Sequence, residues 1–185
     1  RSITISNLTQ GAFDITYGSI DKGLWNFDTN MTALPSHEIA KKMVYLINYR
    51  NIILNKEQLS VMLLNKGMRI GFGGIGKGYA AEMAKKKLVE RNVLSGIINA
   101  SGDLTTWGTQ ASGKPWTIGI AHPDHPSSAF SCLNISGKAI ATSGNYEKCI
   151  IINGKKFSHT IDPKTGFPVT GIKSVTVISN NAELA

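Results

Sequence analysis

Hydrophobic and polar positions follow a helical period in two stretches of the chain. In the first stretch, Ile39, Met43 and Ile47 recur four positions apart, which is the spacing of one face of an α-helix. Ser36 stands just before them, and a serine hydroxyl readily accepts a hydrogen bond from the unpaired N–H groups of a first helical turn. The sequence therefore predicts a helix over residues 37–50 that begins at a serine cap.

The second helical pattern follows directly on a cluster of glycines at positions 71–78. Tyr79, Met83 and Leu88 fall on one side of a helix drawn over residues 77–91, and lysines fall on the other side. A helix is predicted here, with a glycine-rich loop at its start.

Short stretches with strand character, separated by turn residues, make up most of the rest of the chain. The apolar run from Leu59 to Leu64 has the length of a buried strand. Two helices beside many short strands favour an α+β fold with a mostly antiparallel sheet over a repeating βαβ chain. The predicted strands are 51–55, 59–64, 68–72, 95–100, 116–121, 129–136, 147–152 and 174–179.

Size and composition indicate one globular domain over residues 1–185. Hydrophobic residues make up 42% and charged residues 17% of the chain, and no apolar run approaches the roughly 20 residues that span a bilayer. The net charge is +8, but no RNA-binding aromatic signature or zinc-finger spacing accompanies it, so we expect no nucleic-acid partner. A basic chain also suits an anionic small ligand. Cys132 and Cys149 form no CxxC pair, and the sequence leaves open whether they form a disulfide.

The glycine cluster carries the first candidate chemistry. Gly71, Gly73 and Gly76 match a dinucleotide-binding pattern, in which a glycine loop and the N-terminus of a helix present backbone N–H groups to phosphate. A tight strand-to-helix turn explains the same glycines without a ligand. A Rossmann dehydrogenase would use Asp103 on a ribose, but the βαβ units that such a fold requires do not follow.

Three further segments combine small, polar and turn-forming residues. Residues 99–103 and residues 141–146 each end a predicted strand in a polar turn of small residues. His159 is followed by a rigid Asp162-Pro163 turn, in which the aspartate side chain is expected to bond nearby backbone N–H groups. Taken singly, each segment is explained by turn chemistry alone.

In their order along the chain, these segments resemble the motifs of the ApbE family, the FAD:protein FMN transferases, and most closely the Bacteroidetes-type branch. The family fold is α+β, of the T-fold type, with a mostly antiparallel sheet and packed helices. The resemblance covers nearly the whole chain, and five motifs in the right order are far more specific than any one of them. The matching segments are Ala12 to Thr16, Gly73 to Ala80, Gly102-Asp103, Ala141 to Tyr146 and His159 to Pro168.

The resemblance implies an enzyme that binds FAD and a divalent metal, usually magnesium. A threonine or serine hydroxyl of a client protein attacks the FMN-side phosphorus and AMP leaves, so that FMN is joined to the client through a phosphoester. The acceptor is expected in an Asp-x-x-Thr-type motif. Family members usually sit on the periplasmic side of the cytoplasmic membrane, often with a lipid anchor at the N-terminus, which is the only membrane association expected here.

The resemblance also assigns roles to individual positions. His159 is implied to handle a proton or stabilise the leaving group, or else only to orient FAD, and Asp162 is the second candidate catalytic residue. Gly74 is implied to bind metal through its backbone carbonyl. The positions implied to contact FAD are Ala12, Phe13, Asp14, Gly71, Lys77, Asp103, Thr142, Ser143 and Ile161.

Some departures from the family pattern are visible. The family often has an aspartate where this chain has Gly71, so the contact of that side chain with FAD is absent or replaced, and Glu82 stands where the family has another aspartate. Further metal ligands and N-terminal flavin contacts of the family have no counterpart in residues 1–185, so the chain is expected to be truncated at both ends. We therefore expect this chain by itself to bind magnesium weakly and to show little transferase activity, which isothermal titration with FAD present would test.

Two other functions remain open from the sequence. The same scaffold suits a protein that only binds FAD or slowly hydrolyses it to FMN and AMP. A Rossmann NAD-dependent oxidoreductase is the remote alternative, and it predicts parallel strands on both sides of the helix at 77–91.

Overall fold

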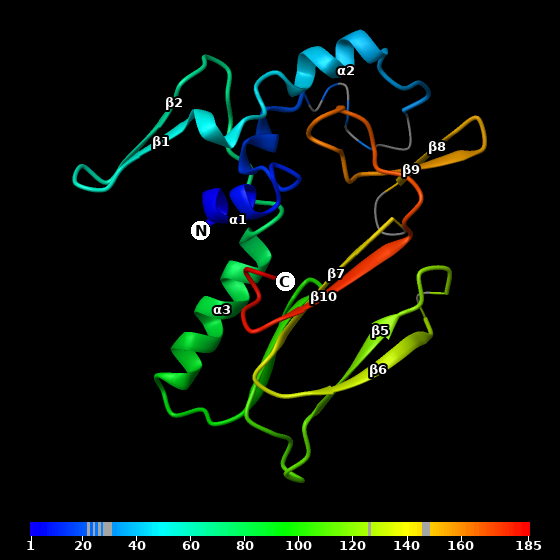
Figure 1. Ribbon diagram of the computed structural model, residues 1–185. Coiled ribbons are helices and arrows are strands. Elements are labelled where there is room, and N and C mark those ends of the chain that lie inside the picture. Colours follow the sequence, from blue (N-terminus) through cyan, green and yellow to red (C-terminus); the bar gives the residue numbers. More distant parts are fainter. Residues whose placement is uncertain (22, 24, 26, 28–30, 126, 146–148) are drawn as a thin grey trace. The chain divides into compact units, whose positions relative to one another are not determined.

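The computed structural model describes residues 1–185 apart from 22, 24, 26, 28–30, 126 and 146–148. Two sequence predictions fall partly outside the described residues, namely the last residue of the Ala141 to Tyr146 segment and the start of the strand at 147–152. The chain divides into two compact units, each built from two stretches (Figure 1). Unit 1 contains Arg1–Gly74 and Glu147–Gly171, and unit 2 contains Ile75–Tyr146 and Ile172–Ala185.

Unit 1 combines short helices with two separate β-hairpins. A small core forms where Ile150, Ile152 and Phe157 of the second hairpin pack together with Met31 and Leu34. Its elements are α1 (Ser2–Leu8), the 3₁₀ helices η1 (Ile15–Ser19) and η2 (Tyr49–Asn51), α2 (His37–Val44), and the hairpins β1 (Ile52–Asn55) with β2 (Ser60–Leu63) and β8 (Cys149–Ile152) with β9 (Lys155–Ser158).

Helix α2 begins as predicted but ends early. The hydroxyl of Ser36 accepts a hydrogen bond from the N–H of Ile39 at 3.3 Å, which confirms the serine cap. The helix stops at Val44 rather than at residue 50. Asn48 breaks the pattern, because its N–H donates to the hydroxyl of Thr16 and its side chain caps η2. An asparagine that bonds to local backbone competes with helix continuation.

The hairpin of β1 and β2 has the predicted strands but not the predicted burial. Leu59 is 90% exposed, and Val61 and Met62 are more than half exposed. Among the described residues, this sheet consists of β1 and β2 alone. The prediction that the run from Leu59 to Leu64 is buried is therefore wrong.

The strand predicted at residues 68–72 is also absent. This segment is a loop that runs against η1, where the N–H of Gly71 donates to the carbonyl of Ile15 at 2.8 Å. The backbone of this segment is hydrogen-bonded to a 3₁₀ helix and not to a neighbouring strand, so the segment is not part of a β-sheet.

Unit 2 is a four-stranded antiparallel sheet with one long helix on it. The strand order is β10-β7-β4-β3, and α3 packs on β3 and β4 (Figure 1). Small side chains at Ala81, Ala139 and Ala182 form the centre of its core. The elements are α3 (Gly76–Val89), β3 (Gly96–Ala100), β4 (Asp103–Trp107), β5 (Trp116–Ala121), β6 (Ala129–Ile135), β7 (Ala139–Gly144) and β10 (Ser174–Ser179), with β5 and β6 as a separate hairpin.

Helix α3 confirms the second helical prediction, but its buried side is made of small residues. Gly78 and Ala81 are buried, whereas Tyr79 is 52% exposed. A side chain at position 78 would overlap the backbone carbonyl of Ala182, so only glycine lets this segment lie against the helix. Glu82 fixes the same contact, because its carboxylate accepts from the N–H of Ala182 at 2.8 Å and from the hydroxyl of Thr105 at 2.9 Å.

Every strand pair between described residues is antiparallel. This confirms the predicted α+β class with a mostly antiparallel sheet and excludes the Rossmann alternative, which requires parallel strands around the helix. Cys132 and Cys149 are both free thiols. Among the described helices, none has the length and apolar character needed to cross a membrane.

Candidate functional site

Asp14 organises the first predicted ligand-binding segment from within. Its side chain is buried, and Oδ1 accepts hydrogen bonds from the N–H of Thr16 at 2.8 Å and from the Thr16 hydroxyl at 2.7 Å. Oδ2 accepts from the N–H of Tyr49 at 2.8 Å. Both carboxylate oxygens are thus engaged inside unit 1, where they cap η1 and join it to η2. This geometry indicates that Asp14 shapes the segment that carries Ala12 and Phe13.

The two aromatic residues of this segment lie against the glycine loop. The ring of Phe13 faces Gly74, where an added Cβ would lie 3.1 Å from it. The ring of Tyr17 lies over Gly71, and its hydroxyl accepts a hydrogen bond from the N–H of Gly73 at 3.0 Å. The structure thus brings Phe13 and Gly74 together, and it adds Tyr17, which the motif comparison did not single out. A side chain at position 71 would have to displace this ring.

Two N–H groups of the loop are used within the protein. The N–H of Gly71 is donated to Ile15 and that of Gly73 to Tyr17. The loop therefore does not present these two groups to a phosphate, as a simple dinucleotide-binding loop would. Beside Gly73 and Gly74, the loop exposes the ring of Phe72, which is 66% exposed.

His159 lies at the end of β9 and is exposed. Its imidazole meets the ring of Phe27 edge-on, with centroids 6.4 Å apart, and Phe27 is in turn stacked on Trp25. Aromatic pairs in this arrangement are attractive and restrict ring orientation. An accessible imidazole held on an aromatic neighbour is well suited to exchange a proton with a ligand.

Asp162 forms the turn that the sequence predicts. Its Oδ1 accepts from the N–H of Lys164 at 2.8 Å, and its carbonyl accepts from the N–H of Gly166 at 2.8 Å. Ile161 lies just before it and forms an isolated antiparallel bridge with Pro168. The turn packs on α2, because a side chain at Gly166 would reach within 2.7 Å of the Ala40 carbonyl. Through these contacts Asp162 holds the loop that follows His159, and its catalytic role stays a prediction.

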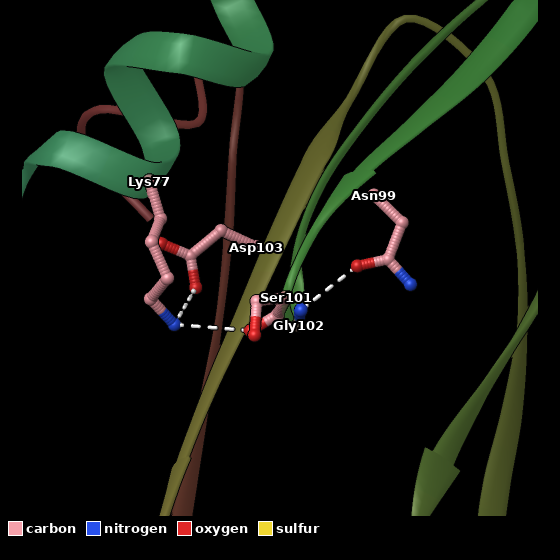
Figure 2. Close-up of polar contacts among 5 residues, drawn as sticks. All are labelled: Lys77, Asn99, Ser101, Gly102 and Asp103. Carbon is pink, nitrogen blue, oxygen red and sulfur yellow. Dashed lines mark hydrogen bonds and ion pairs between the residues drawn. The ribbon is translucent and has the colours of Figure 1, made fainter.

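In unit 2, Lys77 and Asp103 form an ion pair between α3 and the β3–β4 hairpin. The ammonium lies 2.9 Å from Asp103 Oδ1 and 3.1 Å from the carbonyl of Ser101 (Figure 2). Ser101 and Gly102 both have positive φ, which is typical of a type I′ hairpin, and Asn99 Oδ1 accepts the N–H of Gly102. An ammonium has three donor hydrogens. These contacts fix a lysine at the start of α3 with its charge partly compensated.

Thr142 and Ser143 lie within strand β7 and not in a turn, which corrects the sequence prediction for this segment. They pair with Thr176 and Val175 of β10. The hydroxyls of Thr142 and Thr176 are 2.9 Å apart and form a hydrogen bond across the two strands. The strand persists because β10 supplies a full ladder partner, which the local sequence could not reveal.

The predicted site residues are thus divided between the units. Unit 1 holds the two candidate catalytic residues, the predicted metal ligand and five positions predicted to contact FAD, and unit 2 holds the other four. One hollow of about 370 Å³ lies in unit 1, and among the predicted site residues Asp14 alone lines it. The members in unit 1 are Ala12, Phe13, Asp14, Gly71, Gly74, His159, Ile161 and Asp162, and those in unit 2 are Lys77, Asp103, Thr142 and Ser143.

The protein is thus of the α+β class, and each unit carries part of the predicted site residues. The model of the ApbE family matches residues 1–185, and the chain belongs to this family. It is 31% identical to a FAD:protein FMN transferase of Klebsiella pneumoniae (strain 342) over 179 residues, which are 96% of this chain and 54% of that protein. It is 30% identical over 187 residues to the Escherichia coli (strain K12) protein of the same name, covering 98% of this chain and 53% of the relative.

Solved structures agree with the sequence comparison. An ApbE protein from Thermotoga maritima superposes with a TM-score of 0.89 at 31% identity, over 98% of this chain and 59% of the other. The flavin transferase ApbE from Vibrio cholerae superposes with a TM-score of 0.83 at 25% identity, over 100% of this chain and 59% of the other. The chain therefore spans about half the length of the curated relatives it matches.

Proposed function

We propose that the intact protein transfers the FMN half of FAD to a threonine or serine hydroxyl of a client protein. The observation that carries this proposal is the family match over all 185 residues, together with relatives named FAD:protein FMN transferase. The hydroxyl oxygen forms a bond to the FMN-side phosphorus, and the bond from that phosphorus to the bridging oxygen breaks. The bridging oxygen leaves with AMP, and the hydroxyl proton passes to a base.

His159 is the proposed proton carrier. Its exposed imidazole is accessible to a ligand, and its ring contact with Phe27 restricts its orientation. It either takes the proton of the attacking hydroxyl or supports the charge of the leaving AMP. The alternative role is to orient FAD. In either case, Asp162 is proposed to support His159 by holding the turn that follows it, since the Asp162 carboxylate accepts a hydrogen bond from the N–H of Lys164.

Lys77 is the proposed cationic contact for FAD. The side chain is 44% exposed, and Asp103 fixes the position of the ammonium at the start of α3. A lysine interacts with phosphate as a point charge, so an ammonium held in a fixed position attracts the phosphate more strongly. Thr142 and Ser143 are proposed to line the same ligand from β7.

Magnesium dependence is proposed from the family, and the described residues only partly fit such a site. Magnesium needs about six oxygen ligands. Among the residues that the structure describes, no three or more His, Cys, Asp or Glu side chains gather where they could hold a metal ion. Gly74 offers a backbone carbonyl, the one ligand proposed within this chain. These residues do not make a complete magnesium site.

The client and the location are also proposals. The acceptor is a threonine in an Asp-x-x-Thr-type motif, and the intact protein is proposed to work on the periplasmic side of the cytoplasmic membrane, held there by an N-terminal lipid anchor. Secretion with and without the native N-terminus, followed by fractionation, would test this location.

The transfer itself is tested by incubating the intact protein with FAD, magnesium and a client that carries the acceptor motif. We expect covalent flavin on the client, seen as in-gel fluorescence, together with release of AMP in equal amount. A client with the acceptor threonine replaced by alanine is the control and should stay dark. AMP release without labelled client would identify a FAD pyrophosphatase, and FAD binding without AMP release would identify a binding protein.

A further inference from the structure

Tyr17 makes an unusual contact with the glycine loop of unit 1. An added Cβ at Gly71 would lie 2.7 Å from Cε1 and 2.8 Å from Cζ of its ring, closer than real Cβ atoms come. The position of Gly73 is equally constrained by the Tyr17 hydroxyl, which accepts the Gly73 N–H at 3.0 Å. Tyr17 and any side chain at position 71 therefore compete for the same space. The tyrosine ring occupies the volume that a residue at 71 would otherwise fill.

The hydroxyl of Tyr17 retains its own proton for a further partner. A phenol both donates and accepts, and the contact with Gly73 uses it as an acceptor. Among the described residues, no acceptor for this proton is found. The side chain is 38% exposed, so the donor is accessible at the surface of the loop. A fixed donor of this kind suits an acceptor atom of a ligand that binds beside the loop.

We propose that Tyr17 is a positioning and specificity residue for FAD, a role that rests on the proposed function. It fixes the backbone from Gly71 to Gly73 from one side, while Phe13 packs on Gly74 beside it. Its phenolic O–H donates a hydrogen bond to an acceptor atom of FAD. The chain thereby supplies from η1 a polar group that position 71, as glycine, cannot supply.

Steady-state kinetics of Tyr17→Phe tests the donor role. The variant keeps the ring over Gly71 and removes the hydroxyl, which is both the acceptor of the Gly73 N–H and the proposed donor to FAD. We expect the KM for FAD to rise about 3- to 10-fold, the effect of one neutral hydrogen bond, with kcat and the KM for the client unchanged. Tyr45→Phe is the matched control, because Tyr45 is a 75% exposed tyrosine of the same unit, and its KM for FAD should equal that of the wild type.

Melting temperatures of Gly71→Ala test the steric part. The substitution should lower the melting temperature in the wild type, where the new Cβ meets the ring. It should have little effect when combined with Tyr17→Val, which vacates that space. An equal loss in both backgrounds would show that the ring does not constrain position 71, and would overturn this part of the proposal.

The outcomes separate this inference from the proposed function. If the wild type transfers FMN and Tyr17→Phe has an unchanged KM for FAD, the donor role is refuted and the proposed function stands. If the wild type neither binds FAD nor transfers FMN, the proposed function fails and the role of Tyr17 in FAD binding fails with it. A raised KM for FAD at unchanged kcat supports the proposal, since a purely structural tyrosine would not change FAD affinity alone.

Discussion

Replacing His159 by alanine should lower kcat for FMN transfer by at least about 100-fold, the usual effect of removing a group that transfers a proton in the transition state. The side chain is exposed, so its loss creates no core cavity and the fold should persist. If His159 only orients FAD, the KM for FAD rises and kcat changes little. Transfer kinetics at saturating FAD distinguish the two roles.

His125→Ala is the control for this experiment. His125 is also an exposed histidine, but it lies in the loop between β5 and β6 and belongs to none of the family motifs. Its replacement should leave kcat and both KM values unchanged. Full activity of His159→Ala, with an unaltered melting temperature, would remove His159 from the mechanism.

Replacing Asp14 by alanine should lower the free energy of unfolding by about 3 kcal/mol, because buried N–H groups lose a charged acceptor. The carboxylate accepts from the N–H groups of Thr16 and Tyr49 and from the Thr16 hydroxyl. Without it, η1 and η2 lose their common anchor. Urea denaturation followed by circular dichroism measures the effect.

Asp21→Ala provides the comparison for Asp14. Asp21 is exposed, and its carboxylate accepts a hydrogen bond from the N–H of Gly23 at 2.8 Å. Its replacement should change the unfolding free energy by no more than about 0.5 kcal/mol. Asp14→Asn keeps the shape and should give an intermediate loss. If Asp14→Ala proves as stable as the wild type, the carboxylate is not the organising group of this segment.

Local sequence was sufficient where a short-range signal decides the structure. The cap at Ser36 and the strand Ser174–Ser179 depend on neighbouring residues and on apolar spacing, and both were predicted correctly. The turn at Asp162 was also predicted, because an aspartate before proline bonds to the backbone next to it. At these positions, the local sequence is enough to determine the local structure.

Contacts between residues far apart in the sequence determine the parts of the fold that the sequence pattern did not predict. Strand Asp103–Trp107 was missed, since its central residues Thr105 and Thr106 are polar yet completely buried. Their hydroxyls are paired with Glu82 and with the carbonyl of Lys138, far along the chain. A polar strand of this kind has no hydrophobic pattern to reveal it.

The candidate site shows the same division. The motifs predicted Lys77 and Asp103 separately, and the structure joins them in an ion pair. Tyr17 was not predicted, because its contact with Gly71 and Gly73 bridges more than 50 residues of sequence. The one available signal was the run of glycines itself, which indicates that another group approaches the backbone closely.

The central claim is that the motif residues serve FAD and not a nicotinamide cofactor. Titration of the intact protein with FAD and with NADH, followed by the protein's tryptophan fluorescence, tests it most directly. We expect saturable quenching by FAD that excess NADH does not reverse. Saturable binding of NADH with no response to FAD would contradict it.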